Sequence, residues 1–172
     1  MHQRRLIGSM ILALLVLVIT AASGSAATRR FTDPNDARGI DIRGVKVSYA
    51  SWLRVKASYD GRIRVGQNYY IWIDTTRRKA GPEFFFGFIP WSEVGSLQRV
   101  SGFGDKDKTI TKCQKVDGGV NEDRAVIGWG IAGACLGSPK RVRVSVQFVR
   151  PNGTDADWAP AFRSFYPWVP RY

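Results

Sequence analysis

The sequence has few of the side chains that most enzymes use for catalysis. Its 172 residues include one histidine, two cysteines and two methionines, and the histidine, His2, stands at the extreme N-terminus. A domain without imidazole has neither the base of a Ser-His-Asp triad nor the usual ligand of a transition-metal site. No glycine-rich phosphate loop joins a strand to a helix. These absences exclude the histidine-dependent hydrolases, most zinc enzymes and the P-loop nucleotide-binding proteins.

The N-terminus has the pattern of a secretory signal peptide. Arg4 and Arg5 precede a long apolar run, and the small residues 25–27 (SAA) stand at a cleavage position. A basic start, an apolar centre and a small-residue end are the parts of such a signal. We therefore predict a signal over residues 1–27, which would also remove His2, and one domain over residues 28–172. The alternative is an uncleaved anchor, the only route by which we expect contact with a membrane.

The two cysteines, Cys113 and Cys135, predict a disulfide. An even pair in an oxidising compartment normally forms a bridge. Closing a loop of roughly 20 residues would stabilise the fold by about 3 kcal/mol. Two buried free thiols are the alternative.

Short alternating runs of apolar residues predict an all-β fold. Turn-forming pairs such as Asp60-Gly61 separate them, and no amphipathic helix of ten residues or more is apparent. Many short strands with regular turns are typical of a sandwich or barrel. We predict a single antiparallel two-sheet β-sandwich, jelly-roll-like, with the aromatic and proline-rich residues 157–172 strapped across it. The predicted strand runs are 40–47, 52–57, 69–74, 83–89, 96–103, 109–116, 124–131 and 140–149.

Aspartates gather at the entry to the first predicted strand, in FTDPNDARGIDI (31–42). Carboxylate, amide and carbonyl oxygens are the ligands that calcium prefers. A calcium site would take Asp33, Asn35, Asp36 and Asp41 from this segment, and Asp74 from another strand end. We favour a structural role, in which Asp33 and Asp36 shape the turn and Asp41 pairs with an arginine, and calcium binding is the alternative. We commit to no cofactor, and calcium is the one that these residues offer ligands for.

A pair of carboxylates also suffices for glycoside hydrolysis. The aspartates just named and Glu83 are candidates, and nothing in the sequence pairs them. A small hydrolase is therefore an alternative function, from a different class than the binding module that we favour.

Aromatic residues suggest two kinds of contact surface. Trp72 and Trp129 lie inside apolar runs and are predicted to be core, whereas Trp91, Trp158 and Trp168 lie where exposed rings could stack on sugars. Large aromatic rings pack in cores more often than they are left free. The run Phe84–Phe88 could instead present an apolar strand to a protein partner.

The net charge of +12 indicates an affinity for anions. For a secreted protein we expect an extracellular polysaccharide or an anionic cell-wall polymer as partner, and we do not expect nucleic acid. A plain solvated arginine-rich surface is the alternative.

Several segments resemble a known group of proteins. They are DPNDARGIDIRGVKV (33–47), IDTTRRKAGPEF (73–84), ACLGSPKRVRVSV (134–146), DWAP (157–160) and FYPWV (165–169). This set is similar to small secreted actinobacterial β-sandwich proteins of uncharacterised function, and more distantly to jelly-roll modules of the DOMON and carbohydrate-binding kind. The resemblance implies secretion and a β-sandwich. Taken together, we predict a secreted, non-enzymatic binding or structural module of the cell envelope.

Overall fold

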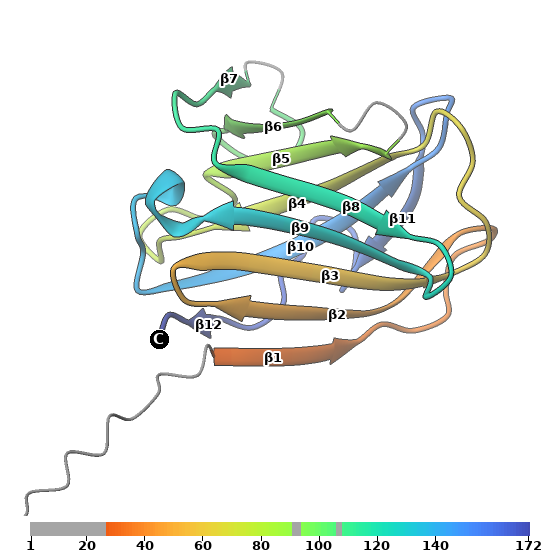
Figure 1. Cartoon of the computed structure of the whole chain (residues 1–172), viewed down its shortest axis with the longest axis horizontal. Coiled ribbons are helices and arrows are strands. Elements are labelled where there is room, and N and C mark those ends of the chain that lie inside the picture. The colour runs from red at the N-terminus through yellow and green to blue at the C-terminus, as the bar shows by residue number, and fades with distance from the viewer. Residues whose placement is uncertain (1–26, 91–93, 106–107) are drawn as a thin grey trace, which may run out of the picture.

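Two antiparallel sheets pack face to face in the computed structural model, which describes residues 27–90, 94–105 and 108–172 (Figure 1). The first sheet has the strand order β1-β2-β3-β9-β8 and the second has the order β11-β10-β4-β5-β6-β7, with β12 paired to β10. The bounds are β1 Ala27–Thr32, β2 Asp41–Tyr49, β3 Trp52–Asp60, β4 Asn68–Asp74, β5 Phe84–Ile89, β6 Val94–Arg99, β7 Thr109–Ile110, β8 Val116–Asn121, β9 Val126–Ala132, β10 Arg141–Val149, β11 Asp155–Ala159 and β12 Val169–Pro170.

The strand order is that of a variable-type immunoglobulin sandwich. In that fold one sheet is A-B-E-D and the other is G-F-C-C′-C″. Here β2-β3-β9-β8 and β11-β10-β4-β5-β6 take those places in chain order, with β1 and β7 added at edges. The predicted two-sheet antiparallel sandwich is confirmed. Its strand order is the immunoglobulin-type order, whereas a jelly-roll order was expected. Turn residues show where a strand ends, but they do not show which sheet the chain enters next.

Alternation along the strands explains the core. On β10, Val142, Val144, Val146 and Phe148 face the opposite sheet, as predicted, and all are buried. Alternate residues of a strand point to opposite faces, so the intervening side chains should face water. Ser145 and Gln147 are nevertheless buried, because a second layer covers this face.

That second layer is an aromatic cluster on the outer face of the second sheet. Its members are Trp72, Phe85, Val100 and Trp158, with Tyr70, Phe103 and Phe165 packed against them. The Trp72 and Trp158 rings stack with their centroids 6.3 Å apart. Trp129 lies in the main core, between the sheets.

The phenylalanine strand faces inward rather than toward a partner. Phe84, Phe85, Phe86 and Phe88 are all buried, because one face of β5 packs into the main core and the other into the aromatic cluster. The expectation that Phe84–Phe88 forms an exposed interaction strand is therefore wrong.

The run 109–116 is the least regular part of the predicted strand pattern. Only β7 and the first residue of β8 are extended there, because the chain crosses from the second sheet to the first. The Gln114 side chain accepts a hydrogen bond from the Leu97 N–H at 3.1 Å and donates one to the Leu97 carbonyl at 3.0 Å. The Thr111 N–H donates to the same carbonyl at 3.0 Å, so this amide side chain and Thr111 together satisfy the backbone of β6 just beyond its pairing with β7.

The predicted disulfide between Cys113 and Cys135 is present. It lies just beyond the Val116–Ile131 pair, the last one at the open end of the β8–β9 hairpin. Cys135 belongs to a single 3-10 turn, η2 (Gly133–Leu136). The bridge therefore fastens the chain at the point where it enters and leaves this hairpin.

Residues 157–159 of the predicted strap belong to the strand β11, and the chain then runs back to the main core. Tyr166 is buried in the main core, where its ring stacks on Phe31 with centroids 4.5 Å apart. The strand β12 then pairs with β10. Within the described ranges, no helix has the length and apolar character needed to cross a bilayer. Residues 1–26 of the predicted signal lie outside the described residues, and Ala27 opens β1.

Candidate functional site

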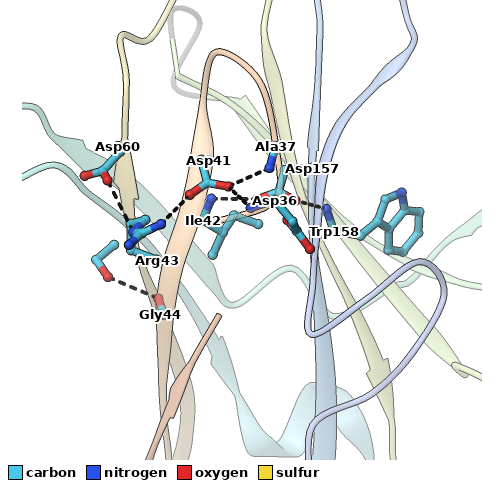
Figure 2. Close-up of polar contacts among 10 residues, drawn as sticks. Asp36, Ala37, Asp41, Ile42, Arg43, Gly44, Asp60, Asp157 and Trp158 are labelled. Atoms are coloured by element: carbon cyan, nitrogen blue, oxygen red, sulfur yellow. Dashed lines mark hydrogen bonds and ion pairs between the residues drawn. The ribbon is translucent and has the colours of Figure 1, made fainter. Parts of the chain in front are cut away.

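Three carboxylates meet where the two sheets join at one end of the sandwich. Asp33 and Asp36 lie on the β1–β2 connection, and Asp157 lies on β11 of the other sheet. Each contributes one oxygen to a group whose members all lie within 4.8 Å of one another. Figure 2 shows Asp36 beside Asp157, with Asp41 and Arg43 alongside. We call Asp33, Asp36 and Asp157 the carboxylate cluster.

Asp157 is held by backbone donors from both sides. Its Oδ2 accepts the Ile42 N–H at 2.6 Å and its Oδ1 accepts the Trp158 N–H at 2.7 Å. The side chain is only 7% exposed. Burial raises the pKa of Asp157, and the two backbone hydrogen bonds oppose that rise. The Ile42 bond also ties β11 of the second sheet to β2 of the first.

Asp33 is buried with one oxygen unsatisfied. Its Oδ1 accepts the Tyr166 hydroxyl at 3.2 Å, while its Oδ2 is enclosed and has no hydrogen-bond partner among the described residues. Burial, followed by the charge of Asp157, raises the pKa of Asp33 to about 7. A buried carboxylate oxygen without a donor costs stability, so this arrangement favours any positive charge that reaches it.

Asp41 lies beside the cluster and organises the loop. Its Oδ1 accepts the Asp36 and Ala37 N–H groups at 3.2 and 2.9 Å. Its Oδ2 pairs with the Arg43 guanidinium at 3.0 Å, which confirms the predicted arginine partner. The turn-shaping role predicted for Asp33 and Asp36 thus belongs to Asp41.

Arg43 reaches Asp41 because of a β-bulge. The register of β2 against β3 shifts between Ile42 and Gly44, so Arg43 is an extra residue whose direction changes. Asp41 and Asp60 face each other across the two strands, and Arg43 bonds both, the second at 3.2 Å. Gly44 is required here, since a Cβ would lie 2.9 Å from the Phe31 carbonyl oxygen.

Asp74, another predicted calcium ligand, is not part of the cluster. Asp74 is fully buried and bonded to Arg143, so its charge is already balanced. Asn35 is exposed on the same loop as Asp36. The structure therefore keeps Asp33 and Asp36, adds Asp157, and assigns other partners to Asp41 and Asp74.

The tryptophans do not form a sugar-stacking platform in the described part of the chain. Trp158 is buried in the aromatic cluster, which contradicts its expected exposure. Trp168 is half-buried, and the guanidiniums of Arg77, Arg141 and Arg143 lie 4.9–5.9 Å from its ring centroid. Trp91 lies outside the described residues.

A hollow of about 360 Å³ opens among arginines at the same end of the sandwich. We call it the arginine pocket. Arg150 has its Nη2 3.3 Å from the Arg38 carbonyl oxygen and also donates to the Asp155 carbonyl. No carboxylate is among the described residues that line it: Arg38, Gly39, Ile40, Arg62, Arg64, Gln67, Arg150 and Pro151.

The outer face of the first sheet carries a row of cations. Arg30 lies opposite Lys46, and Lys46 lies opposite Lys56, on three adjacent strands. All three are exposed, and none has an ion-pair partner within the described part of the chain. On β9 and β8 the row continues as Gly128 and Gly119.

Part of this arrangement could have been found in the sequence. The pocket arginines lie directly beside predicted strand ends: Arg38 before the first, Arg62 and Arg64 after Asp60-Gly61, and Arg150 after the run 140–149. Antiparallel strand ends gather at the two ends of a sandwich, so a shared end was a possible inference. Asp157 gave no comparable signal, because nothing local connects DWAP to residues 33–36.

Comparisons with models of known protein families and with curated proteins find no match for this chain.

Proposed function

We propose that this protein is a secreted, non-enzymatic binding module of the cell envelope, and that its arginine pocket takes the anionic groups of an extracellular polymer. The observation that carries the proposal is that Arg38, Arg62, Arg64 and Arg150 all line one hollow, and that no described residue lining it is a carboxylate.

Guanidinium chemistry determines the class of ligand. Arginine presents a planar fork of N–H donors that matches carboxylate and phosphate oxygens two at a time. The Arg150 fork is oriented by its bonds to two backbone carbonyls, so less rotational freedom is lost when a ligand binds. The residues lining the pocket therefore favour phosphate or carboxylate groups over neutral sugars.

The position of the pocket supports a binding role. Arg62 and Arg64 lie on the β3–β4 loop and Arg150 on the β10–β11 connection. These correspond to the B–C and F–G loops, which with C′–C″ form the recognition end of immunoglobulin variable domains. This is an analogy between folds, and it agrees with the general rule that loops on a rigid scaffold carry recognition.

The competing functions have less support. A glycoside hydrolase needs a sugar to reach two carboxyl groups, whereas Asp33 and Asp157 are 6% and 7% exposed and both oxygens of Asp157 accept backbone N–H groups. Secretion is a proposal that the disulfide supports, because such bridges persist in oxidising compartments.

The test is calorimetric titration of the protein with inorganic polyphosphate and polygalacturonate, with neutral dextran for comparison. We expect both polyanions to bind and dextran not to bind. The double variant Arg62→Ser/Arg64→Ser should weaken binding at least tenfold. The control Arg78→Ser/Lys79→Ser removes the same charge from an exposed loop and should weaken it much less. Equal losses in the two variants, or no binding of either polyanion, would overturn the proposal.

A further inference from the structure

The carboxylate cluster has the ligand oxygens of a cation site, and none of its members forms an ion pair with a lysine or arginine of the described residues. Asp33, Asp36 and Asp157 bring one oxygen each to within 4.8 Å. No described lysine or arginine pairs with any of them, since Arg43 is engaged by Asp41 and Asp60. Three ionised carboxylates this close repel one another, and a proton on one of them or a cation between them relieves that repulsion.

A second observation points to a ligand independently of this grouping. Asp33 is only 6% exposed, yet its Oδ2 has no hydrogen-bond partner in the described part of the chain. Buried polar groups in folded proteins are normally satisfied. Tyr166 supplies a donor to Oδ1 only, so the enclosed Oδ2 of Asp33 has no partner among the residues that the structure describes.

We propose that Asp33, Asp36 and Asp157 bind a hard divalent cation, calcium, which joins the β1–β2 connection of one sheet to β11 of the other. This site is separate from the arginine pocket and does not depend on the proposed function.

The donor set selects the metal class. All three ligands are oxygens, without the imidazole or thiolate that zinc and copper prefer. Calcium accepts six to eight oxygens at about 2.3–2.6 Å in irregular geometry and completes its shell with carbonyls and water. Asp36 is exposed, so the ion has a route from solvent, while Asp33 and Asp157 form a buried base.

Binding would reinforce contacts between distant segments. Asp157 already bonds Ile42 of β2, and Asp33 already bonds Tyr166 of the C-terminal segment. A cation would hold these two carboxylates together, so its loss should loosen the junction between the sheets.

Terbium luminescence provides a direct readout. Tb³⁺ replaces Ca²⁺ at oxygen sites and emits when a nearby tryptophan is excited, and Trp158 is the residue next to Asp157. We expect saturable Tb³⁺ emission from the full chain, displaced by Ca²⁺. In the absence of Tb³⁺, calcium at about one hundred times its dissociation constant should raise Tm by about 5–10 °C, and excess chelator should reverse the shift.

Asp36→Asn is the test variant, because this side chain is exposed and its loss should not impair folding. It should weaken Tb³⁺ and Ca²⁺ binding at least tenfold. The control is Asp123→Asn, an exposed aspartate of the β8–β9 turn, which should bind as the unmodified protein does. The absence of saturable emission and of any calcium effect on Tm would overturn the proposal, as would unchanged binding by Asp36→Asn.

Discussion

Arg143 and Asp74 lie directly opposite each other on β10 and β4, and the Nε and Nη2 atoms of Arg143 reach one oxygen of Asp74 at 2.6 and 2.5 Å. The pair is asymmetric in its exposure to water. The Asp74 side chain is 0% exposed, and the Arg143 side chain is 30% exposed. Asp74 also accepts the Thr76 N–H at 3.0 Å.

This asymmetry predicts unequal costs for removing the two partners. Arg143→Leu leaves a fully buried carboxylate with no cation and should lower the free energy of unfolding by about 3–5 kcal/mol. Asp74→Asn leaves a guanidinium that can turn toward water, so its cost should be smaller, about 1–3 kcal/mol. Urea unfolding measures both, and a larger loss for Asp74→Asn would contradict this view of the pair.

The cation row on the first sheet predicts a stabilising substitution. Like charges directly opposite each other on neighbouring strands are destabilising, and Lys46 has Arg30 on one side and Lys56 on the other. Lys46→Gln should therefore raise the free energy of unfolding by about 0.2–1 kcal/mol. The difference should shrink in about 1 M salt, where charges are screened beyond roughly 3 Å.

The matched control for this substitution is Lys112→Gln. Lys112 is exposed and lies outside the strands, so it has no opposing cation in a ladder. Its replacement should leave stability nearly unchanged at both salt concentrations. A comparable gain from both substitutions would mean that total charge, rather than the row, determines the effect.

The position of the disulfide predicts which part of the sandwich unfolds locally when the bridge is removed. The bridge joins residues 22 positions apart, and removing it through Cys113→Ala/Cys135→Ala should lower the free energy of unfolding by about 3 kcal/mol on the chain-entropy model. Hydrogen exchange should accelerate most around Val116 and Ile131, the pair next to the bridge. Uniform acceleration across both sheets would show that the bridge acts on the whole fold.

The cluster predicts an unusual pH dependence in the presence of a chelator. The pKa of Asp33 is about 7 in the folded protein against an ordinary value of 3.8, so the folded state keeps a proton that the unfolded chain has lost. The free energy of unfolding should fall as pH rises from about 4 to 7, and it should stay low above pH 7. Thermal unfolding should therefore give a higher Tm at pH 5 than at pH 8.

Asp33→Asn is the control for that measurement. The groups facing Asp33 are Asp157, Asp36 and Asp41, the Tyr166 hydroxyl and the Arg43 guanidinium. Of these, Asp157 also has a raised pKa, so the variant should flatten the profile without abolishing the slope. A profile that is unchanged by Asp33→Asn would assign the pH dependence to other carboxyl groups.

Short-range patterns in the sequence were enough to predict several features of this protein. The alternation of Val142, Val144 and Val146 predicts a strand with one buried face, and β10 has it. Two cysteines allow only one intramolecular pairing, and the Cys113–Cys135 bridge is present. The buried face of a strand depends only on nearby residues, and two cysteines leave only one possible bridge. The sequence by itself therefore determined both features.

Tertiary structure decided the rest. Trp158 was expected to be exposed, but Trp72 and Phe103 cover it from segments far away in the chain. Asp33 meets Tyr166 across 133 positions and Ile42 meets Asp157 across 115, contacts that exist only because β2 and β11 lie at a shared junction of the two sheets. A sequence shows which side of a strand is apolar, whereas the choice of neighbour depends on how the chain crosses between sheets. Both candidate sites arise from those crossings. Asp157 became visible only in the folded protein for that reason, whereas the pocket arginines already stood beside predicted strand ends in the sequence.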